Sequence, residues 1–255
     1  MNSELKALIF DVDGTLTDNE MAGHRVAFNL AFRKAGLGWH WDEPTYHRLL
    51  EVFGGKERIR YFVESFNPDF EAPEDLDAFI LDLHKEKTSQ YMGLLRAGAL
   101  PLRPGVERLF REARSAGVRL AVASTTTFEN VTLLLSETVG EHAVDWFDVI
   151  AAGDVAKNKK PAPDIFLHAL DRLGLKAREC LAIEDTEAGL ASATAAGLTT
   201  LITVNPTTRN EDFSGAALVV DQLGEPDQPF EVLAGDAGGA TYVDLALLRR
   251  LHSAR

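Results

Sequence analysis

Apolar residues along the chain follow two patterns. Short continuous apolar runs, each bounded by charged or turn-forming residues, lie at residues 7–10, 118–123, 180–183 and 200–204. We interpret these runs as strands buried on both faces, because a strand with one face in water alternates apolar and polar positions. Segments 104–117 and 163–174 instead carry apolar residues at helical spacing, begin with proline and end with glycine. This alternation predicts an α/β fold with a doubly wound parallel sheet, whose ligands bind at the carboxyl ends of the strands.

The stretch from residue 18 to residue 98 interrupts this alternation. It contains only helical patterns, near residues 23–35, 43–53, 56–66 and 76–95. Since no strand is predicted within it, we expect a helical cap domain of residues 18–98 inserted into a core of residues 1–17 and 99–255. The segment 221–255 is rich in turn-forming residues and ends in the apolar sequence VDLALLRRLH. We interpret that segment as a peripheral extension.

Composition and charge narrow the class of protein. The 255 residues are 45% hydrophobic and 25% charged, as in ordinary globular proteins, which argues against disorder, collagen and coiled coil. The formal net charge of −13 repels nucleic acid and anionic lipid, and the sequence shows no basic stripe to offset it, so neither is an expected partner. A single cysteine excludes an intrachain disulfide, and the N-terminal segment resembles neither a signal peptide nor a membrane span. These features predict a cytoplasmic location.

Polar residues follow the predicted strands at the edge where ligands bind. They are Asp11 and Asp13 after the first strand, Ser124 after the second, Lys160 before the next helix, and Glu184 and Asp185 after the third strand. Each has an ordinary structural explanation: a turn, a helix cap or a solvated charge. Their coincidence at one edge of one sheet favours a common site.

One reaction, the attack of a carboxylate on a phosphate group, would use all of these residues. A carboxylate that attacks a phosphomonoester meets about two negative charges, and each pair of unit charges at ~4 Å costs about 4 kcal/mol at an effective dielectric constant of ~20. A divalent cation held by Asp11 and Asp185, with Glu184 binding directly or through water, would offset this repulsion. Lys160 would add a further positive charge. Oxygen ligands favour Mg²⁺ over zinc.

With this ordering, the sequence resembles the haloacid dehalogenase superfamily of phosphotransferases. The resemblance rests on "DVDGT", the serine of "AVASTTT", the second lysine of "KKPAPD" and the acidic pair of "AIEDT". It implies that Asp11 is the nucleophile that forms an aspartyl-phosphate. Asp13 would act as general acid and base and bind the metal through its backbone carbonyl, and Ser124 and Lys160 would bind the phosphoryl group. An aspartate rather than a threonine at position 13 favours hydrolysis or mutase transfer over a long-lived phosphoenzyme.

The inserted segment resembles the helical cap of the subgroup that contains β-phosphoglucomutase, phosphoglycolate phosphatase and the CbbY-type sugar-bisphosphate phosphatases. The stretches "DNEMAGHRVAFN", "GGKERI" and "STTTFEN" are similar to the CbbY type, although Glu20 and His24 are one residue further apart than in some relatives. The resemblance implies a substrate site formed by Glu20, His24, Gly54, Gly55, Lys56, Arg58, Thr125 and Asn130, together with the core residues Asp11, Ser124 and Lys160. Lys56 and Arg58 are the expected partners of a distal phosphate.

The leading hypothesis is a Mg²⁺-dependent phosphatase that acts on a phosphorylated sugar, in particular a pentulose bisphosphate such as xylulose-1,5-bisphosphate. We expect a monomer or a weak oligomer. A β-phosphoglucomutase-type mutase with the same cap and motifs is the first alternative. A receiver-type signalling module also uses aspartate, lysine and Mg²⁺ on a doubly wound sheet. Receivers, however, are about half as long, lack a cap and do not place a second aspartate two residues after the first.

Overall fold

The computed structural model describes residues 4–52 and 54–254 and divides the chain into two compact units. The core unit comprises Met1–Asp18 and Pro101–Arg255, and the helical unit comprises Asn19–Leu100. The chain therefore leaves the core unit one residue later than predicted and returns to it two residues later. The two units are described separately below.

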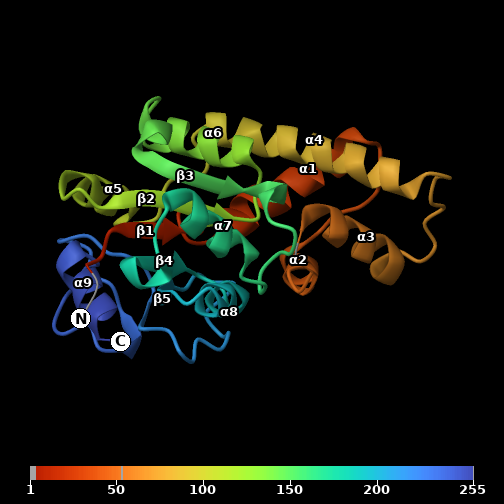
Figure 1. The fold of residues 1–255 in the computed structure, drawn as a ribbon. Helices are drawn as coiled ribbons and strands as arrows, with labels where there is room; N and C mark the ends of the chain where they lie inside the picture. Colours follow the sequence, from red (N-terminus) through yellow and green to blue (C-terminus); the bar gives the residue numbers. More distant parts are fainter. Residues whose placement is uncertain (1–3, 53, 255) are drawn as a thin grey trace. The chain divides into compact units, whose positions relative to one another are not determined.

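A seven-stranded sheet forms the centre of the core unit, in the order β3-β2-β1-β4-β5-β6-β7 (Figure 1). The strands are β1 (Ala7–Phe10), β2 (Arg119–Ser124), β3 (Phe147–Ala152), β4 (Cys180–Glu184), β5 (Thr199–Thr203), β6 (Leu218–Val220) and β7 (Val232–Gly235). Neighbouring strands are parallel from β3 to β6. All four predicted strands are present, with ends within one residue of those expected, so the α/β class is confirmed.

Three strands were not predicted from the sequence. β3 lies at one edge of the sheet and includes the exposed Asp148, so it lacks the continuous apolar run that marks a central strand. β6 has only three residues, and β7 pairs antiparallel with β6 and is largely exposed. The sheet is therefore mostly parallel, as predicted, with one antiparallel strand at this edge that the sequence did not indicate. The segment after Val220 contributes a strand rather than only a peripheral extension.

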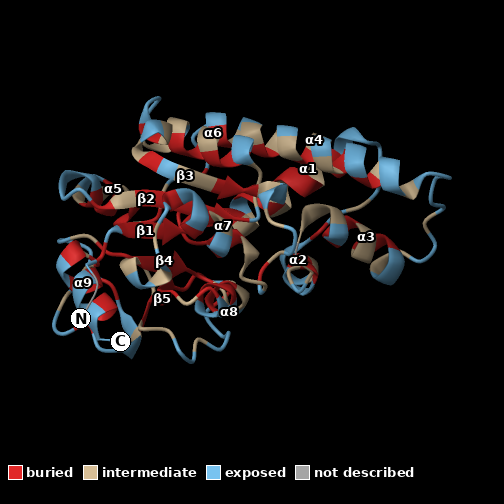
Figure 2. Ribbon diagram, in the orientation of Figure 1, coloured by how far each residue is buried: buried red, intermediate tan, exposed pale blue. Residues whose placement is uncertain are grey.

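Helices cover both faces of the sheet. They are α5 (Val106–Ser115), α6 (Phe128–Thr138), α7 (Asp164–Leu173), α8 (Glu187–Ala195) and α9 (Leu245–Ser253), with the short 3₁₀ turns η2 (Ala143–Trp146), η3 (Gly153–Val155) and η4 (Ala177–Glu179). Along β1, Ala7 and Ile9 pack in the cluster formed with α7, whereas the ring of Phe10 meets Phe110 of α5 at 5.0 Å. Both faces of the central strands are consequently buried (Figure 2). This burial explains their continuous apolar sequences.

The helical unit consists of five helical segments. They are the π-helix η1 (Glu20–Arg25), α1 (Val26–Lys34), α2 (Glu43–Leu49), α3 (Gly55–Phe66) and α4 (Leu76–Arg96). Its core is aromatic: the Trp41 ring lies 4.5 Å from that of Phe28 and 5.3 Å from that of Phe62. The predicted helix 43–53 ends early, at Leu49, and residue 53 lies outside the described residues.

The buried stripe of α4 includes a lysine. Ile80, Leu83, Lys87, Tyr91 and Leu95 recur at spacings of three and four residues and are the buried positions of this helix. Lys87 thus occupies a place where an apolar side chain is normal. Among the described residues, no helix has both the length and the apolar character needed to cross a membrane.

Candidate active site

The predicted core residues meet at the carboxyl ends of three adjacent strands. β1 lies between β2 and β4, and Phe10 is in register with Val122 of β2 and Ile183 of β4. The next residue along β1, Asp11, is therefore brought beside the end of β4, where Glu184 and Asp185 stand. Sequence order alone places these side chains far apart, and the parallel register brings them together.

Lys160 lies at the centre of this group. Its Nζ donates hydrogen bonds to Asp11 Oδ1 at 2.6 Å, to the Ala123 carbonyl at 3.0 Å and to Glu184 Oε1. Asp11, Glu184 and Asp185 offer carboxylate oxygens within 4.8 Å of one another, and all three residues are buried. Three of the four predicted metal ligands thus form one cluster. Asp13, whose proposed ligand is its backbone carbonyl, is half-buried two residues after Asp11.

The excess of carboxylates controls the ionisation of the cluster. The pKa of Asp11 is raised to about 7: burial raises it most, Lys160 lowers it, and Glu184 and Asp13 raise it. Burial also raises the pKa of Asp185 well above its ordinary value, with contributions from Asp11 and Glu184. Burial by itself lowers the pKa of Lys160, but Asp11 and Glu184 raise it above its ordinary value. The lysine is charged, and the carboxylates lack sufficient positive charge around them.

The residues present fit a divalent cation. Three clustered carboxylates, two of them paired with the ammonium group of Lys160, leave two negative charges uncompensated when all are ionised. Buried charges of this kind require a partner. The oxygen-only donor set of Asp11, Glu184 and Asp185 suits Mg²⁺, whereas zinc sites use nitrogen and sulfur ligands more often.

Glu184 is held by a backbone N–H of the motif and by a glycine outside it. Its Oε2 accepts a hydrogen bond from the Asp185 backbone N–H at 3.1 Å. Gly189 of α8 packs directly on the Glu184 carboxylate, and a Cβ at that position would clash with it. The glycine in "EDTEAGL" was therefore an available signal in the sequence.

Asp185 has two partners, of which Asn205 was not predicted. Thr15 Oγ1 donates to its Oδ1 at 3.1 Å, and Asn205 Nδ2 donates to its Oδ2 at 2.7 Å. Asn205 lies two residues after the end of β5, another carboxyl end of the sheet. The sequence signal was its position after a predicted strand.

The loop after β2 places the remaining core residues. Ser124 ends the strand and is buried, and its Oγ accepts a hydrogen bond from the Thr126 N–H at 3.3 Å. Thr127, rather than Ser124, is the N-cap of α6, so the helix-cap explanation for Ser124 is wrong. Thr125 is exposed. Asn130 is buried, and its Oδ1 has no hydrogen-bond partner in the described part of the chain.

In the helical unit, Glu20 and Arg58 meet through a tyrosine. Tyr46 Oη donates to Glu20 Oε2 at 2.7 Å and accepts from Arg58 Nη1 at 2.8 Å. The Arg58 Nη1 is 3.8 Å from Glu20 Oε2, and its Nε donates to the Leu49 carbonyl at 3.1 Å. These contacts orient the predicted substrate residues Glu20 and Arg58, and Tyr46 is a member of the group that the sequence did not indicate.

His24 lies in a second polar group, on the π-helix. Its Nδ1 is 2.8 Å from Lys87 Nζ, and its ring stacks on Tyr91 with centroids 4.3 Å apart. A π-helical turn accommodates about one residue more than an α-helical turn, which accounts for the longer spacing between Glu20 and His24. His24 and Lys87 are both buried.

Lys56 and Lys87 both lie near His84, as the pKa of His84 indicates. The pKa of His84 is lowered to about 4, first by burial and then by Lys87 and Lys56. Lys56 is the second residue of α3, which begins at Gly55 after the N-cap Gly54, and a Cβ on Gly55 would clash with the His84 ring. Lys56, His84 and Lys87 therefore form a basic cluster, of which only Lys56 was predicted.

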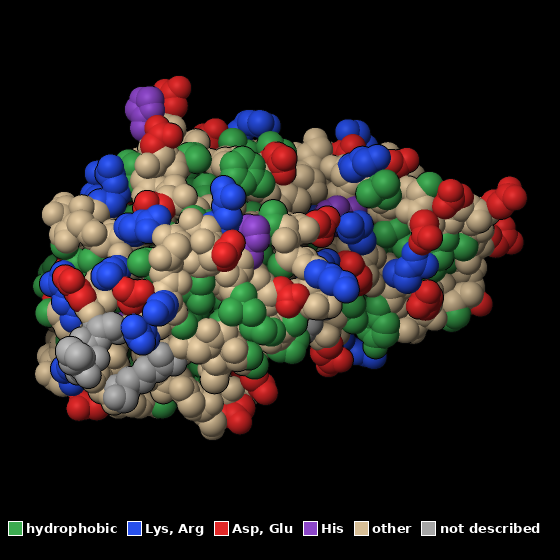
Figure 3. Space-filling view, viewed as in Figure 1, with side chains coloured by type: hydrophobic (Ala, Val, Ile, Leu, Met, Phe, Trp, Pro, Cys, Tyr) green, Lys and Arg blue, Asp and Glu red, His purple; other side chains and the backbone are tan. Residues whose placement is uncertain are grey.

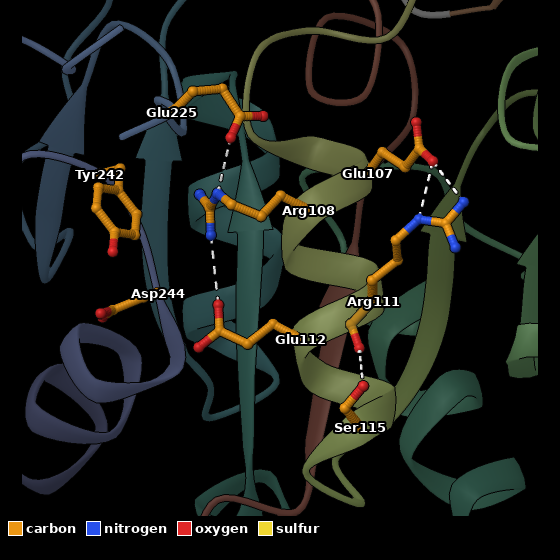
Figure 4. Close-up of a pocket in the computed structure, with 8 residues that line it drawn as sticks. All are labelled: Glu107, Arg108, Arg111, Glu112, Ser115, Glu225, Tyr242 and Asp244. Carbon is orange, nitrogen blue, oxygen red and sulfur yellow. Dashed lines mark hydrogen bonds and ion pairs between the residues drawn. The ribbon is translucent and has the colours of Figure 1, made fainter. Parts of the chain in front are cut away.

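A cavity of about 620 Å³ lies between α5 and the segment that leads to α9, and no predicted core site residue lines it. Figure 4 shows Arg108 in it, bridging Glu225 and Glu112, and Arg111 paired with Glu107. These polar groups are bonded to one another, and none of them was a predicted site residue. On the face shown in Figure 3, acidic and basic side chains are interspersed.

Comparison with known proteins places the chain in a family. The sequence profile of the haloacid dehalogenase-like hydrolases matches residues 5–197. The plasmid-encoded protein CbbY of Cupriavidus necator is 45% identical over 255 residues, which cover 97% of each protein. Protein CbbY of Rhodobacter capsulatus is 50% identical over 213 residues, covering 84% of this chain and 91% of that protein.

Solved structures agree with this placement. A crystal structure of CbbY from Rhodobacter sphaeroides in complex with xylulose-(1,5)-bisphosphate has a TM-score of 0.79 at 42% identity, covering 86% of this chain and 94% of that one. A β-phosphoglucomutase from Clostridium difficile has a TM-score of 0.68 at 26% identity, covering 86% and 91%. This chain therefore belongs to the haloacid dehalogenase-like hydrolases, in their CbbY-like and β-phosphoglucomutase-like subgroup, and is an enzyme, a phosphatase.

Proposed function

We propose that this enzyme is a Mg²⁺-dependent phosphatase that hydrolyses a sugar phosphate, in particular a bisphosphate such as xylulose-1,5-bisphosphate, through an aspartyl-phosphate. The observation that carries the proposal is the buried contact of Asp11 with Lys160 beside Glu184 and Asp185. This arrangement combines a nucleophile, a positive charge and an oxygen-only cation site at one sheet edge. A receiver-type signalling module does not fit the family to which the chain belongs.

Asp11 carries the covalent step. One of its carboxylate oxygens attacks phosphorus as the bond from phosphorus to the sugar oxygen breaks, and Asp13 gives its proton to that oxygen. Asp13 then takes a proton from water, the water oxygen attacks phosphorus, and the bond to Asp11 breaks to release inorganic phosphate. Ser124 and Lys160 bind the phosphoryl oxygens throughout.

Asp11, Glu184, Asp185 and the backbone carbonyl of Asp13 are the proposed ligands of Mg²⁺. When bound, Mg²⁺ offsets the repulsion between the carboxylate nucleophile and the phosphate oxygens. Lys160 keeps its charge because Asp11 and Glu184 raise its pKa, so it contributes to the same compensation at neutral pH.

The helical unit supports a bisphosphate rather than a monophosphate. The core residues can bind only the phosphoryl group that is transferred, so a second phosphate requires other cations. The ammonium groups of Lys56 and Lys87, which lie near the neutral His84, and the oriented guanidinium of Arg58 supply them. The complex of the Rhodobacter sphaeroides CbbY with xylulose-(1,5)-bisphosphate supports the same substrate class for this chain. Glu20, His24, Gly54, Gly55, Thr125 and Asn130 complete the proposed substrate site.

Phosphate release from a panel of sugar monophosphates and bisphosphates, with Mg²⁺ and with a chelator, tests this proposal. We expect preference for a bisphosphate, loss of activity without Mg²⁺, and a loss of several orders of magnitude in Asp11→Asn. Asp148→Asn, which removes a surface carboxylate paired with Arg119, serves as the control and should retain activity. Near-normal hydrolysis by Asp11→Asn would contradict the mechanism.

The mutase alternative has one observation in its favour, the structural similarity to β-phosphoglucomutase. Conversion between sugar phosphate positions without net phosphate release would support it over hydrolysis. The monomeric or weakly oligomeric state, the cytoplasmic location and the lack of nucleic-acid and membrane partners stay predictions. The location would be tested by fractionation and the oligomeric state by light scattering.

A further inference from the structure

Asp185 accepts one hydrogen bond on each carboxylate oxygen. Thr15 Oγ1 donates to Oδ1 at 3.1 Å and Asn205 Nδ2 to Oδ2 at 2.7 Å, and all these groups are buried. The two donors come from different places, the loop after β1 and the loop after β5. Together they define the plane of the carboxylate.

The orientation of the Asn205 amide is determined by a turn of its own loop. Asn205 Oδ1 accepts from the Thr207 N–H at 2.9 Å and from Thr207 Oγ1 at 2.6 Å. Because a backbone N–H can only donate, the amide oxygen must face Thr207 and the amide nitrogen must face Asp185. Asn205 therefore presents a donor, not an acceptor, to the carboxylate.

The two donors hold both oxygens of the Asp185 carboxylate in place. Each oxygen accepts one hydrogen bond, from Thr15 or from Asn205, and each keeps a lone pair that can bind a cation. The loop after β1 leaves no space for reorientation: Gly14 packs directly on Asp185 Oδ2 and Asn205 Nδ2, and a Cβ there would clash with both. Asn205 can hold the carboxylate without adding charge to the site.

We propose that Asn205 is a positioning residue that fixes Asp185 in the orientation needed to bind the divalent cation. This inference rests on the proposed Mg²⁺-dependent function. It adds a determinant of metal affinity that lies outside the sequence motifs of the site.

Direct titration of the full-length, metal-free protein with Mg²⁺ by calorimetry tests the proposal. Asn205→Leu removes the donor at similar size. Asn205→Ser keeps an oxygen that can accept from the Thr207 N–H, so the turn is retained, but its side chain is too short to reach Asp185. We expect both variants to bind Mg²⁺ about 10- to 100-fold more weakly. The Mg²⁺ concentration for half-maximal phosphatase activity should rise by the same factor, while kcat at saturating Mg²⁺ recovers to within a few-fold.

Asn29→Leu is the matched control, since Asn29 is a structural amide of the helical unit that bonds the backbone of Trp41 on both sides. It should bind Mg²⁺ like the wild type even where it lowers stability. Unchanged Mg²⁺ affinity in Asn205→Ser would overturn the inference and leave the proposed function intact. Failure of the wild type to bind Mg²⁺ would overturn both.

Discussion

At the scale of single residues, two aspartates of one short motif meet different surroundings. Asp11 is buried and bonded to Lys160, whereas Asp13 is half-buried. A carboxylate held beside an ammonium group suits a nucleophile, and a more accessible one suits proton exchange with a leaving group and water. The motif identified both residues, but only their environments separate the two roles.

The proton-transfer role of Asp13 predicts a dependence on the leaving group. General acid–base help is worth about 10²- to 10⁴-fold, and an activated aryl phosphate does not need it for departure of the aryl oxide. Asp13→Asn should therefore lose much more of its kcat/KM on a sugar phosphate than on an aryl phosphate, measured in the first turnover. Equal losses on both substrates would argue against proton donation by Asp13.

Arg58 predicts discrimination between bisphosphates and monophosphates. Charge-assisted hydrogen bonds to a phosphate contribute about 1.5–3 kcal/mol, so Arg58→Ala should lower kcat/KM for a bisphosphate by roughly 10- to 100-fold. Hydrolysis of the monophosphate that lacks the distal group should change little. Arg48→Ala, which removes a guanidinium stacked on Phe66 in the same unit, is the control. A uniform loss on both substrates would mean that the contacts of Arg58 with Tyr46 and Glu20 serve stability instead.

At the scale of elements, the buried stripe of α4 contains a lysine, Lys87, which forms a polar group with residues of other helices. The stripe follows the expected helical spacing, yet it places Lys87 against His24 and over the rings of Phe28 and Tyr91 at 5.0 and 5.2 Å. The position of the helix was predicted to within one residue. Two of these groups, His24 and Phe28, come from η1 and α1, so the sequence of α4 alone could not identify them.

The neutral state of His84 on α4 predicts a pH dependence of stability. Burial first, then Lys87 and Lys56, lower its folded-state pKa from 6.5 to about 4, so the unfolded chain binds the proton more readily. The contribution of neutral His84 is complete above pH 6.5 and is lost as the pH falls towards 4. Allowing for its partial exposure, we expect about 1–2 kcal/mol.

Urea unfolding followed by tryptophan fluorescence measures this effect, because Trp39 and Trp41 lie in the helical unit. Between pH 6.5 and 4, the wild type should lose more stability than His84→Gln. His142→Gln, at an exposed position of the core unit, should behave like the wild type. Identical pH profiles for wild type and His84→Gln would contradict the prediction.

At the scale of the whole molecule, arginines hold together segments that are remote in sequence. Arg103 donates to the Gly14, Thr203 and Asp221 carbonyls and pairs with Asp18, the last residue before the chain leaves the core unit. Arg108 of α5 donates to Glu225 and to the carbonyls of Gly224 and Val243 (Figure 4). Through these contacts the segment after Val220 is part of the core unit.

Loss of the Arg108 contacts should loosen the attachment of α9, which packs against α5 and β4. Hydrogen exchange of the backbone amides of α9 reports this, because the amides of a helix that opens more often exchange faster. We expect Arg108→Met to increase the exchange rate of these amides by about 5- to 100-fold, since each hydrogen bond contributes about 1 kcal/mol. Arg114→Met, which removes a guanidinium stacked on Trp146, is the control. Equal exchange of α9 in Arg108→Met and wild type would show that these contacts do not hold α9.

The sequence by itself determined the local features of this protein. Continuous apolar runs identified the four central strands because both of their faces are covered, and the helical spacing of 76–95 identified α4 because it has one buried face. The edge strands β3 and β7 were missed because an exposed strand carries no such run. The core motif residues could be predicted because each directly follows, or precedes, an element that the pattern defines.

Only the tertiary structure decided which groups act on these residues. The hydrogen bonds of Asp185 with Asn205, of Glu20 with Tyr46 and of Lys87 with His24 join residues 20 to 63 positions apart, and no spacing rule relates them. Burial determines the ionisation of Asp11 and His84, and burial depends on every element packed around a residue. The kinds of side chain at the site were thus set by sequence, whereas their charge, orientation and partners depend on contacts between distant segments.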